Sequence, residues 1–183
     1  MGALVKRNDR QAAVEVVAED RNQYLTFQLG GEMFAIGILN IKEIIEYGSL
    51  TEVPMMPEFI RGVINLRGAV VPVLDLSARF GRKRTEVTRR TCIVIIEVET
   101  NEEKHDVGVV VDSVSEVLEI AGGEIEPAPS FGTKIRADFI HGMGKVNGKF
   151  VIILSVNNVL SLDDLALLEH AAGADVPLAA PAA

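Results

Sequence analysis

A stretch of 17 residues occurs twice in the sequence, and this repeat constrains the fold more than any other feature. Residues 59–75, FIRGVINLRGAVVPVLD, align with residues 139–155, FIHGMGKVNGKFVIILS, at an offset of 80 positions. Residues 35–46 also match residues 108–119, at an offset of 73. Two matched blocks in the same order indicate that the chain contains one structural unit repeated.

The composition indicates a compact acidic protein. With 183 residues, 48% of them hydrophobic, the chain is long enough to bury a sizeable core. The 18 Lys and Arg against 26 Asp and Glu give a net charge of −8, which argues against a nucleic-acid partner. Cys92 is the single cysteine, so no internal disulfide forms and a reducing compartment is favoured. The sequence shows neither a membrane-spanning run nor a signal peptide, so we expect a cytoplasmic protein without direct membrane insertion.

Alternating apolar residues and glycine turns predict short strands joined by hairpins. The glycines at 30–31 predict a hairpin over residues 24–38. Within the repeated unit, residues 67–68 and 147–148 predict two more hairpin turns. Residues 39–46, LNIKEIIE, fit a helix or a strand, and their β-branched side chains favour the strand.

Two residues of the first repeated unit have a predicted local role. Pro72 has no backbone N–H to donate, so its strand is expected at a sheet edge or at a bulge. Asp75 is expected to cap a short helix over residues 76–80.

These elements predict one domain between two unstructured ends. Short strands leave unpaired edges unless they close, so two small β-barrels with an apolar seam are expected. The predicted order is a mobile arm at 1–20, then a single domain at 21–172, then a disordered tail at 173–183. The domain comprises a first lobe at about 23–80, a basic link at 81–90, a second lobe at about 91–160 and a C-terminal helix at 161–172.

The sequence contains no motif typical of a catalytic or metal site. His105, His141 and His170 do not have metal-ligand spacing with Cys92 or with paired carboxylates. His141 occupies the repeat position of Arg61, which predicts a tolerant, exposed position. We therefore expect no enzyme activity, no metal and no cofactor.

Two basic features have two interpretations each. Arg67, at the tip of a predicted turn, is either a solvated turn residue or folds back onto backbone carbonyls or a carboxylate such as that of Asp75. Residues 79–90 carry six basic residues and one acidic residue. They form either a soluble tether between the lobes or a patch that attracts an acidic partner. Exposed apolar side chains over residues 41–45 would indicate a protein-docking surface.

Several stretches resemble the CheW family of bacterial chemotaxis coupling proteins over residues 23–172: IGILNIKEI, VPMMPEFIRGVINLRGAVVPVLDLSARFG, VGVVVDSVSEVLEI, IEPAPSF and FIHGMGKVNGKFVIIL. The resemblance implies a mainly β fold of two intertwined five-stranded SH3-like β-barrels with short helices and a C-terminal helix. It also implies a non-catalytic adaptor that couples chemoreceptor cytoplasmic signalling domains to the regulatory domain of the histidine kinase CheA. Such an adaptor is monomeric alone and multimeric in membrane-associated receptor arrays. The alternative is a module of the same fold that serves a different two-component or non-chemotaxis signalling array.

The resemblance also assigns expected roles to individual residues. The receptor-binding residues would be Ile38, Ile41, Glu43, Thr91, Cys92 and Ile93. The residues important for coupling or structure would be Gly62, Arg67 and Asp75, with Arg67 holding the shape of the receptor site. The kinase-binding residues would be Glu126 and Phe131. The family frequently has a basic residue where Glu126 stands, so a salt bridge at that contact is removed or reversed in sign here.

Overall fold

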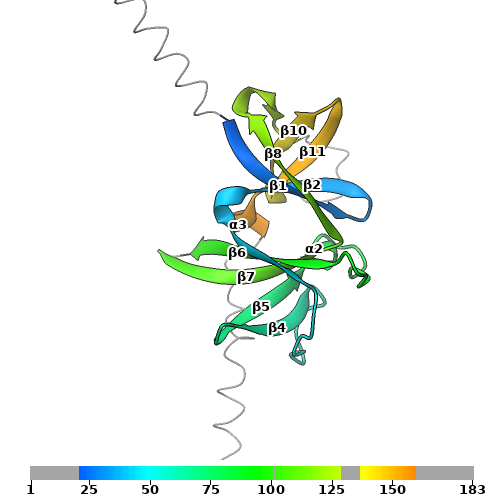
Figure 1. Cartoon of the computed structure of the whole chain (residues 1–183), viewed down its shortest axis with the longest axis vertical. Coiled ribbons are helices and arrows are strands. Elements are labelled where there is room, and N and C mark those ends of the chain that lie inside the picture. The colour runs from blue at the N-terminus through cyan, green and yellow to red at the C-terminus, as the bar shows by residue number, and fades with distance from the viewer. Residues whose placement is uncertain (1–20, 101, 129–136, 160–183) are drawn as a thin grey trace, which may run out of the picture.

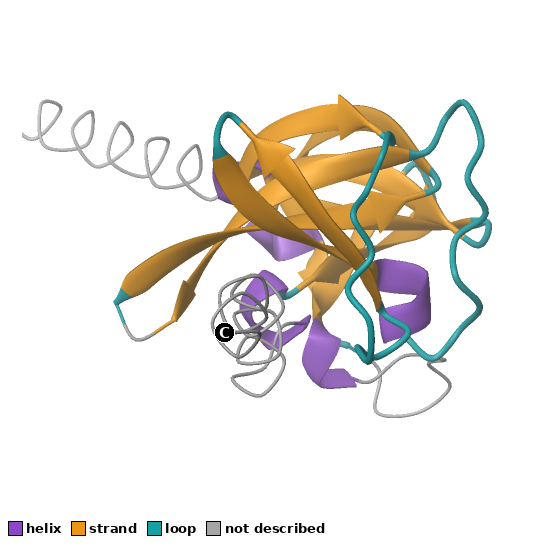
Figure 2. Ribbon diagram, turned by 90° about the horizontal axis from the view of Figure 1, so that it is seen from below, coloured by secondary structure: helices purple, strands orange, loops and turns teal. Residues whose placement is uncertain are grey.

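Strands make up most of the structure, and its helical segments are short turns (Figure 2). The computed structural model describes residues 21–100, 102–128 and 137–159. The strands are β1 (Arg21–Leu29), β2 (Glu32–Gly37), β3 (Ile41–Glu46), β4 (Ile60–Leu66), β5 (Ala69–Asp75), β6 (Cys92–Thr100), β7 (Glu103–Val111), β8 (Ser113–Ala121), β9 (Ile125–Glu126), β10 (Ile140–Val146) and β11 (Lys149–Leu154). The helical turns are η1 (Ile38–Asn40), α2 (Leu76–Arg79), η2 (Gly122–Glu124), η3 (Ala137–Phe139) and α3 (Val156–Val159). All three predicted hairpin turns and the strand predicted within residues 39–46 are confirmed.

The strands form two sheets, each curled into a small barrel, and the chain passes from one to the other after β2 and again after β7 (Figure 1). The upper barrel has the strand order β8-β1-β2-β11-β10-β9, and the lower barrel has the order β3-β6-β7-β5-β4. The predicted division into lobes at 23–80 and 91–160 differs from this arrangement. Strands β1 and β2 pair with the second half of the chain, and β6 and β7 pair with the first half. Residues 81–90 therefore connect two elements of the lower barrel.

The repeat explains why the barrels are intertwined. In chain order, β1 to β5 of the first repeat correspond to β6, β7, β8, β10 and β11 of the second. Each barrel combines the first two strands of one repeat with the last three strands of the other, and the upper barrel also contains the short strand β9. A parallel pair results in each barrel, β5 beside β7 and β11 beside β2. Parallel neighbours need a crossover connection, and the exchange between barrels supplies it.

The 17-residue unit folds alike in both barrels. The register shifts between Ile60 and Gly62 in β4, and it shifts at the equivalent place in β10. The turn residues Arg67 and Asn147 both have positive φ, 53° and 51°. A short helix follows each unit, and the predicted cap of α2 is confirmed, because the Asp75 carboxylate accepts a hydrogen bond from the backbone N–H of Ala78.

Pro72 does not lie in an edge strand, because β5 runs between β4 and β7. It stands opposite Val63, whose backbone N–H points away from β5 and donates to the carbonyl oxygen of Thr51 at 2.9 Å. Residues 63 and 72 are therefore a pair without mutual backbone hydrogen bonds. The ladder between β5 and β7 begins only at Val73. The missing N–H of Pro72 thus interrupts neither ladder.

The main hydrophobic core lies between the barrels. Its buried side chains include Leu25, Phe27, Leu29, Phe34 and Ile36 from the upper barrel, and Leu74, Val94, Ile96, Val107 and Val109 from the lower barrel. Ring contacts at 6.1, 5.7 and 5.9 Å between centroids connect Phe27, Phe34, Phe80 and Phe139 in that order. Two smaller clusters lie within the barrels. The predicted apolar seam is confirmed, and its burial is the main source of stability that both barrels share.

Several predicted elements lie outside the described residues. These are the arm at 1–20, the C-terminal helix at 161–172, the tail at 173–183 and the residues Phe131 and His170. Within the described ranges, no helix is long and apolar enough to cross a lipid bilayer.

Candidate protein-docking site

The edge strand β3 carries an apolar side chain at the open border of the core. β3 is an edge strand of the lower sheet, and Ile44 stands opposite Val94 of β6. Directly opposed residues of neighbouring strands project to the same face, and Val94 is buried in the core between the barrels. Ile44 therefore lies where this core opens to solvent, with 42% of its surface exposed. Ile41 of the same strand packs partly against the same core.

The edge strand β8 provides the corresponding border of the upper barrel. Val114 stands opposite Phe27 and Val117 opposite Leu25, and both β1 partners are buried in the shared core. Val117 is 44% exposed. The two borders together are named the interbarrel margin, which consists of Ile41, Ile44, Cys92, Val114 and Val117. Apolar side chains left open on two edge strands are typical of a surface that binds another protein.

A hollow lies next to β3, at the turn η1. Its volume is about 540 Å³, and its lining residues are Asn22, Gln23, Tyr24, Gly37, Ile38, Leu39, Asn40 and Glu119. Ile38, predicted to bind the receptor, is part of this lining, and the neighbouring Leu39 is 95% exposed. An apolar side chain with so much exposed surface gains free energy when a partner covers it.

Two of the six residues predicted to contact the receptor are buried. Ile93 is 1% exposed and packs inside the lower barrel. Thr91 is 2% exposed, and its hydroxyl accepts a hydrogen bond from the backbone N–H of Thr88 at 2.8 Å. Direct contact through these two side chains is therefore a wrong prediction. Side chains alternate along β6, so Cys92 faces the shared core while Ile93 points into the barrel.

Cys92 contributes a half-buried thiol to the interbarrel margin. Its Sγ donates a hydrogen bond to the carbonyl oxygen of Arg90 at 3.3 Å. Burial raises the pKa of the Cys92 thiol, the carboxylate of Glu46 raises it further, and a backbone hydrogen bond from Val114 acts in the opposite direction. The thiol therefore stays protonated at neutral pH and serves as a small apolar side chain.

Glu43 and Arg67 form an ion pair on the lower barrel, with Nη2 of Arg67 2.8 Å from Oε2 of Glu43. Glu43 belongs to β3 and Arg67 to the turn between β4 and β5, so the pair bridges the two ends of the lower sheet. Asp75 is not the partner of Arg67, because Arg61 occupies it. Since 79% of the Arg67 side chain is exposed, the ion pair contributes only about 0.5 kcal/mol to stability. Its main effect is to orient both side chains beside β3.

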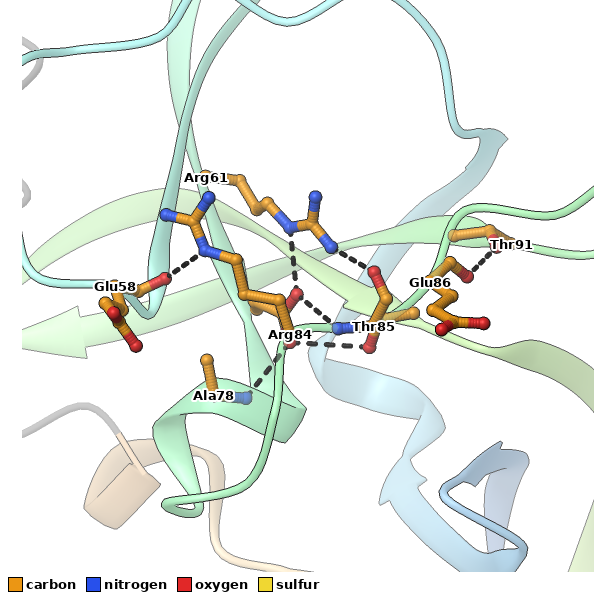
Figure 3. A network of polar contacts seen from close by, with 8 residues as sticks. Glu58, Arg61, Ala78, Arg84, Thr85, Glu86 and Thr91 are labelled. Atoms are coloured by element: carbon orange, nitrogen blue, oxygen red, sulfur yellow. Dashed lines mark hydrogen bonds and ion pairs between the residues drawn. The ribbon is translucent and has the colours of Figure 1, made fainter.

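A buried ion pair anchors the segment between α2 and β6. The fully buried Asp75 carboxylate accepts hydrogen bonds from Nε of Arg61 at 2.8 Å and from the backbone N–H of Thr85 at 3.0 Å. Arg61 also donates to the carbonyl oxygen of Thr85 (Figure 3). Arg61 is therefore not the tolerant exposed position that the repeat predicted, although its counterpart His141 is exposed. Nor are residues 81–90 a free tether.

Gly62, predicted to matter for coupling, is required by packing. Its φ is +149°, and a Cβ atom at this position would lie 2.3 Å from the carbonyl oxygen of Thr51. Thr51 and Val63 exchange two backbone hydrogen bonds of 2.9 Å, which hold the preceding loop against β4. Only glycine permits this approach of two backbones.

Glu126, the predicted kinase contact, is exposed on β9 of the upper barrel. It lines a hollow of about 500 Å³ together with Glu119, Gly123, Glu124, Lys145, Val146 and Asn147. Three glutamates against one lysine make this hollow acidic, so a basic partner side chain fits it. The Glu126–Met143 pair occupies the place that Thr51–Val63 has in the lower barrel, because residues 63 and 143 are repeat equivalents.

The structure thus brings together part of the predicted site and adds to it. Ile41 and Cys92 both pack against the shared core, at opposite ends of the pairing between β3 and β6, while Glu43 and Arg67 lie together on the lower barrel. The sequence did not single out Val117, although residues 108–119 match residues 35–46. The direction of the Val117 side chain depends on the pairing of β8 with β1, which the structure shows. In the described part of the chain, no group of three or more His, Cys, Asp or Glu side chains is placed to hold a metal ion.

Two intertwined barrels with an open apolar margin define a two-barrel protein-interaction domain. The chain belongs to the CheW-like family, whose domain model matches residues 23–164. It is 33% identical over 150 residues to the chemotaxis protein CheW of Klebsiella aerogenes, a match covering 82% of this chain and 88% of that protein. It is 35% identical over 136 residues to the CheW of Bacillus subtilis, covering 74% and 85% of the two chains. The solved structure of the scaffolding protein TtCheW from Thermoanaerobacter tengcongensis is similar, with a TM-score of 0.69, 34% identity and coverage of 78% and 90%.

Proposed function

We propose that this protein is a non-catalytic scaffold that couples the cytoplasmic signalling domains of chemoreceptors to the regulatory domain of the histidine kinase CheA. The receptors thereby control the activity of the kinase. The protein works in the cytoplasm, is monomeric alone and joins multimeric, membrane-associated receptor arrays. Its membership in the CheW-like family and its similarity to chemotaxis CheW proteins support this role.

The interbarrel margin is the observation that carries the proposal. Ile44 and Val117 expose apolar surface on two edge strands, one from each barrel. A receptor signalling domain bound there contacts both barrels at once. Its affinity comes from covering these side chains and from a polar rim that includes the Glu43–Arg67 pair.

The kinase binds elsewhere on the same body. Glu126 lies on β9, and the hollow that it lines reaches β8 at Glu119 but does not include Val117, so a regulatory domain bound there leaves Val117 accessible. Receptor and kinase can therefore occupy the scaffold together. Individually weak contacts of this kind gain strength when many copies assemble in one array.

Reconstitution tests the proposal directly. Purified protein is co-sedimented with receptor signalling fragments and CheA from the same cell, and kinase autophosphorylation is measured in the same tubes. We expect activity to rise only when all three components are present. If the protein neither co-sediments nor changes kinase activity, the coupling role is rejected, and the chain serves a different signalling array.

A pair of matched variants locates the receptor contact. Ile44→Asp places a charge in the interbarrel margin, and we expect at least a tenfold loss of receptor affinity with little change in stability. Phe150→Asp is the control, because Phe150 is also half-exposed, at 52%, but lies on β11. Ile41 is less suitable, since it packs on the shared core and an Asp there would also lower stability. Equal receptor affinities of the two Asp variants would refute the assignment of the margin.

A further inference from the structure

Arg79 occupies the place where the two repeats meet. It ends α2 of the lower barrel, and its guanidinium lies over the ring of Phe59 at 5.1 Å and over the ring of Phe139 at 4.7 Å, measured to the ring centroids. Phe59 and Phe139 are repeat equivalents, 80 positions apart. The guanidinium thus interacts with the same aromatic residue of both repeats, one beside each barrel.

A hydrogen bond fixes the orientation of the Arg79 guanidinium. Nε of Arg79 donates to the carbonyl oxygen of Val159 at 3.0 Å. Val159 ends α3, the short helix that follows β11 of the upper barrel, and it is the residue 80 positions after Arg79. One arginine of the first repeat therefore binds its own counterpart in the second. The first repeat has an arginine at this position, Arg79, whereas the second repeat has a valine, Val159.

This contact differs in kind from the rest of the seam. The core between the barrels is built from aliphatic and aromatic side chains, whose hydrophobic attraction is non-directional. A guanidinium that stacks on two rings and donates to a carbonyl is satisfied in one geometry only. A second directional contact from the same segment is the ion pair of Arg82 with Glu32 of β2, at 3.0 Å.

We propose that Arg79 is a positioning residue for signal coupling, which locks the orientation of the upper barrel relative to the lower one. This inference rests on the proposed scaffold function. The interbarrel margin has one border on each barrel, whereas the Glu126 hollow belongs to the upper barrel alone. A fixed orientation is therefore what lets a receptor at the margin act on a kinase at β9. With the lock removed, the kinase still binds but no longer responds to the receptor.

The test compares Arg79→Met with Arg84→Met in the full-length chain. Methionine keeps the length and the apolar packing of the arginine stem but removes the cation and the donor. Arg84 is a matched control, because its Nε donates to the carbonyl oxygen of Glu58 at 2.9 Å within the lower barrel. Spin labels on Ala69→Cys and Lys149→Cys, in a Cys92→Ser background, report the distance between barrels, since both sites are exposed and are repeat equivalents.

We expect Arg79→Met to broaden the distance distribution and to reduce receptor-dependent kinase activation at least fivefold. The affinity of the isolated CheA regulatory domain should stay within twofold of the parent, and Arg79→Lys should restore part of the activation. Arg84→Met should change none of these quantities. If Arg79→Met folds poorly, Glu32→Gln is used instead, because it removes the ion pair with Arg82. This variant must also broaden the distance distribution and reduce receptor-dependent kinase activation.

Each possible failure has a separate meaning. A narrow distance distribution in Arg79→Met, or unchanged activation despite a broad one, overturns the positioning role while the scaffold function stands. If the parent protein itself gives no receptor-dependent activation, the proposed function fails, and with it the coupling role of Arg79.

Discussion

Replacing Gly62 by Ala tests whether this position acts through packing. The Cβ of alanine would lie 2.3 Å from the carbonyl oxygen and 2.9 Å from the carbonyl carbon of Thr51, at a backbone φ of +149°. Even the weakly attractive contacts between carbon and carbonyl oxygen lie at about 3.3 Å or more, so one of the two backbones must move by about 1 Å. The movement pulls Thr51 away from its two hydrogen bonds with Val63.

The expected cost has two parts. Holding a side chain in a backbone region reserved for glycine costs about 1–3 kcal/mol, and overpacking against a rigid neighbour costs about 1–3 kcal/mol more. We therefore expect Gly62→Ala to lower the free energy of unfolding by about 4 kcal/mol, a large share of the roughly 5–15 kcal/mol of a typical domain. Gly68→Ala is the control, because its φ of +87° brings strain but its Cβ would meet no atom within 4 Å. Its cost should be about 1 kcal/mol.

The assay is urea denaturation of the full chain, followed by circular dichroism, for the parent and both variants. A gap of about 2 kcal/mol or more between the two alanine variants supports the packing argument. Equal stabilities of the two variants would refute it, because the clash with Thr51 is what distinguishes them. Loss of kinase coupling in a normally stable Gly62→Ala protein would instead assign Gly62 a direct contact with a partner.

Two further predictions concern buried and half-buried polar groups. Asp75→Asn should lower the free energy of unfolding by about 3 kcal/mol in the same urea assay, because it leaves the Arg61 guanidinium, 13% exposed, without its counter-charge. Combining it with Arg61→Gln should recover part of this loss, and identical stabilities of the single and double variants would contradict the argument. For Cys92, whose thiol pKa is raised by burial and by Glu46, the rate of alkylation should increase only at alkaline pH. Glu46→Gln should move the midpoint of this profile to lower pH, and an unchanged midpoint would show that Glu46 has no influence.

The sequence predicted the local structure well because local structure depends on nearby residues. The turn at Asn147 needs a positive φ, and an Asn-Gly pair provides it at low cost. The cap by Asp75 needs only a carboxylate at the start of a helix. Failures arose where a residue's partner is distant. Arg61 was predicted to be exposed from its repeat equivalent, yet Asp75 and Thr85 bury it.

The residues of the candidate site likewise divide into those that the sequence identified and those that only the structure identified. The family resemblance marked Ile41, Glu43 and Cys92, and the structure places them on the edge strand β3 and on its neighbour β6. The resemblance could not distinguish Cys92 from Ile93, because the direction in which each side chain points depends on the register with β3 and β7. Val117 became a candidate only when β8 was seen to be an edge strand.

The order of residues along the chain is enough to show that one unit occurs twice, that its hairpins turn at glycines and that the chain resembles CheW-like proteins. The pairing of each strand with a strand of the other repeat appears only in the folded protein, because hydrophobic patterning makes a strand amphipathic but does not specify which strand it pairs with. The exchange of strands places most of the core between the barrels, and Arg79 meets Phe59, Phe139 and Val159 only as a result of it.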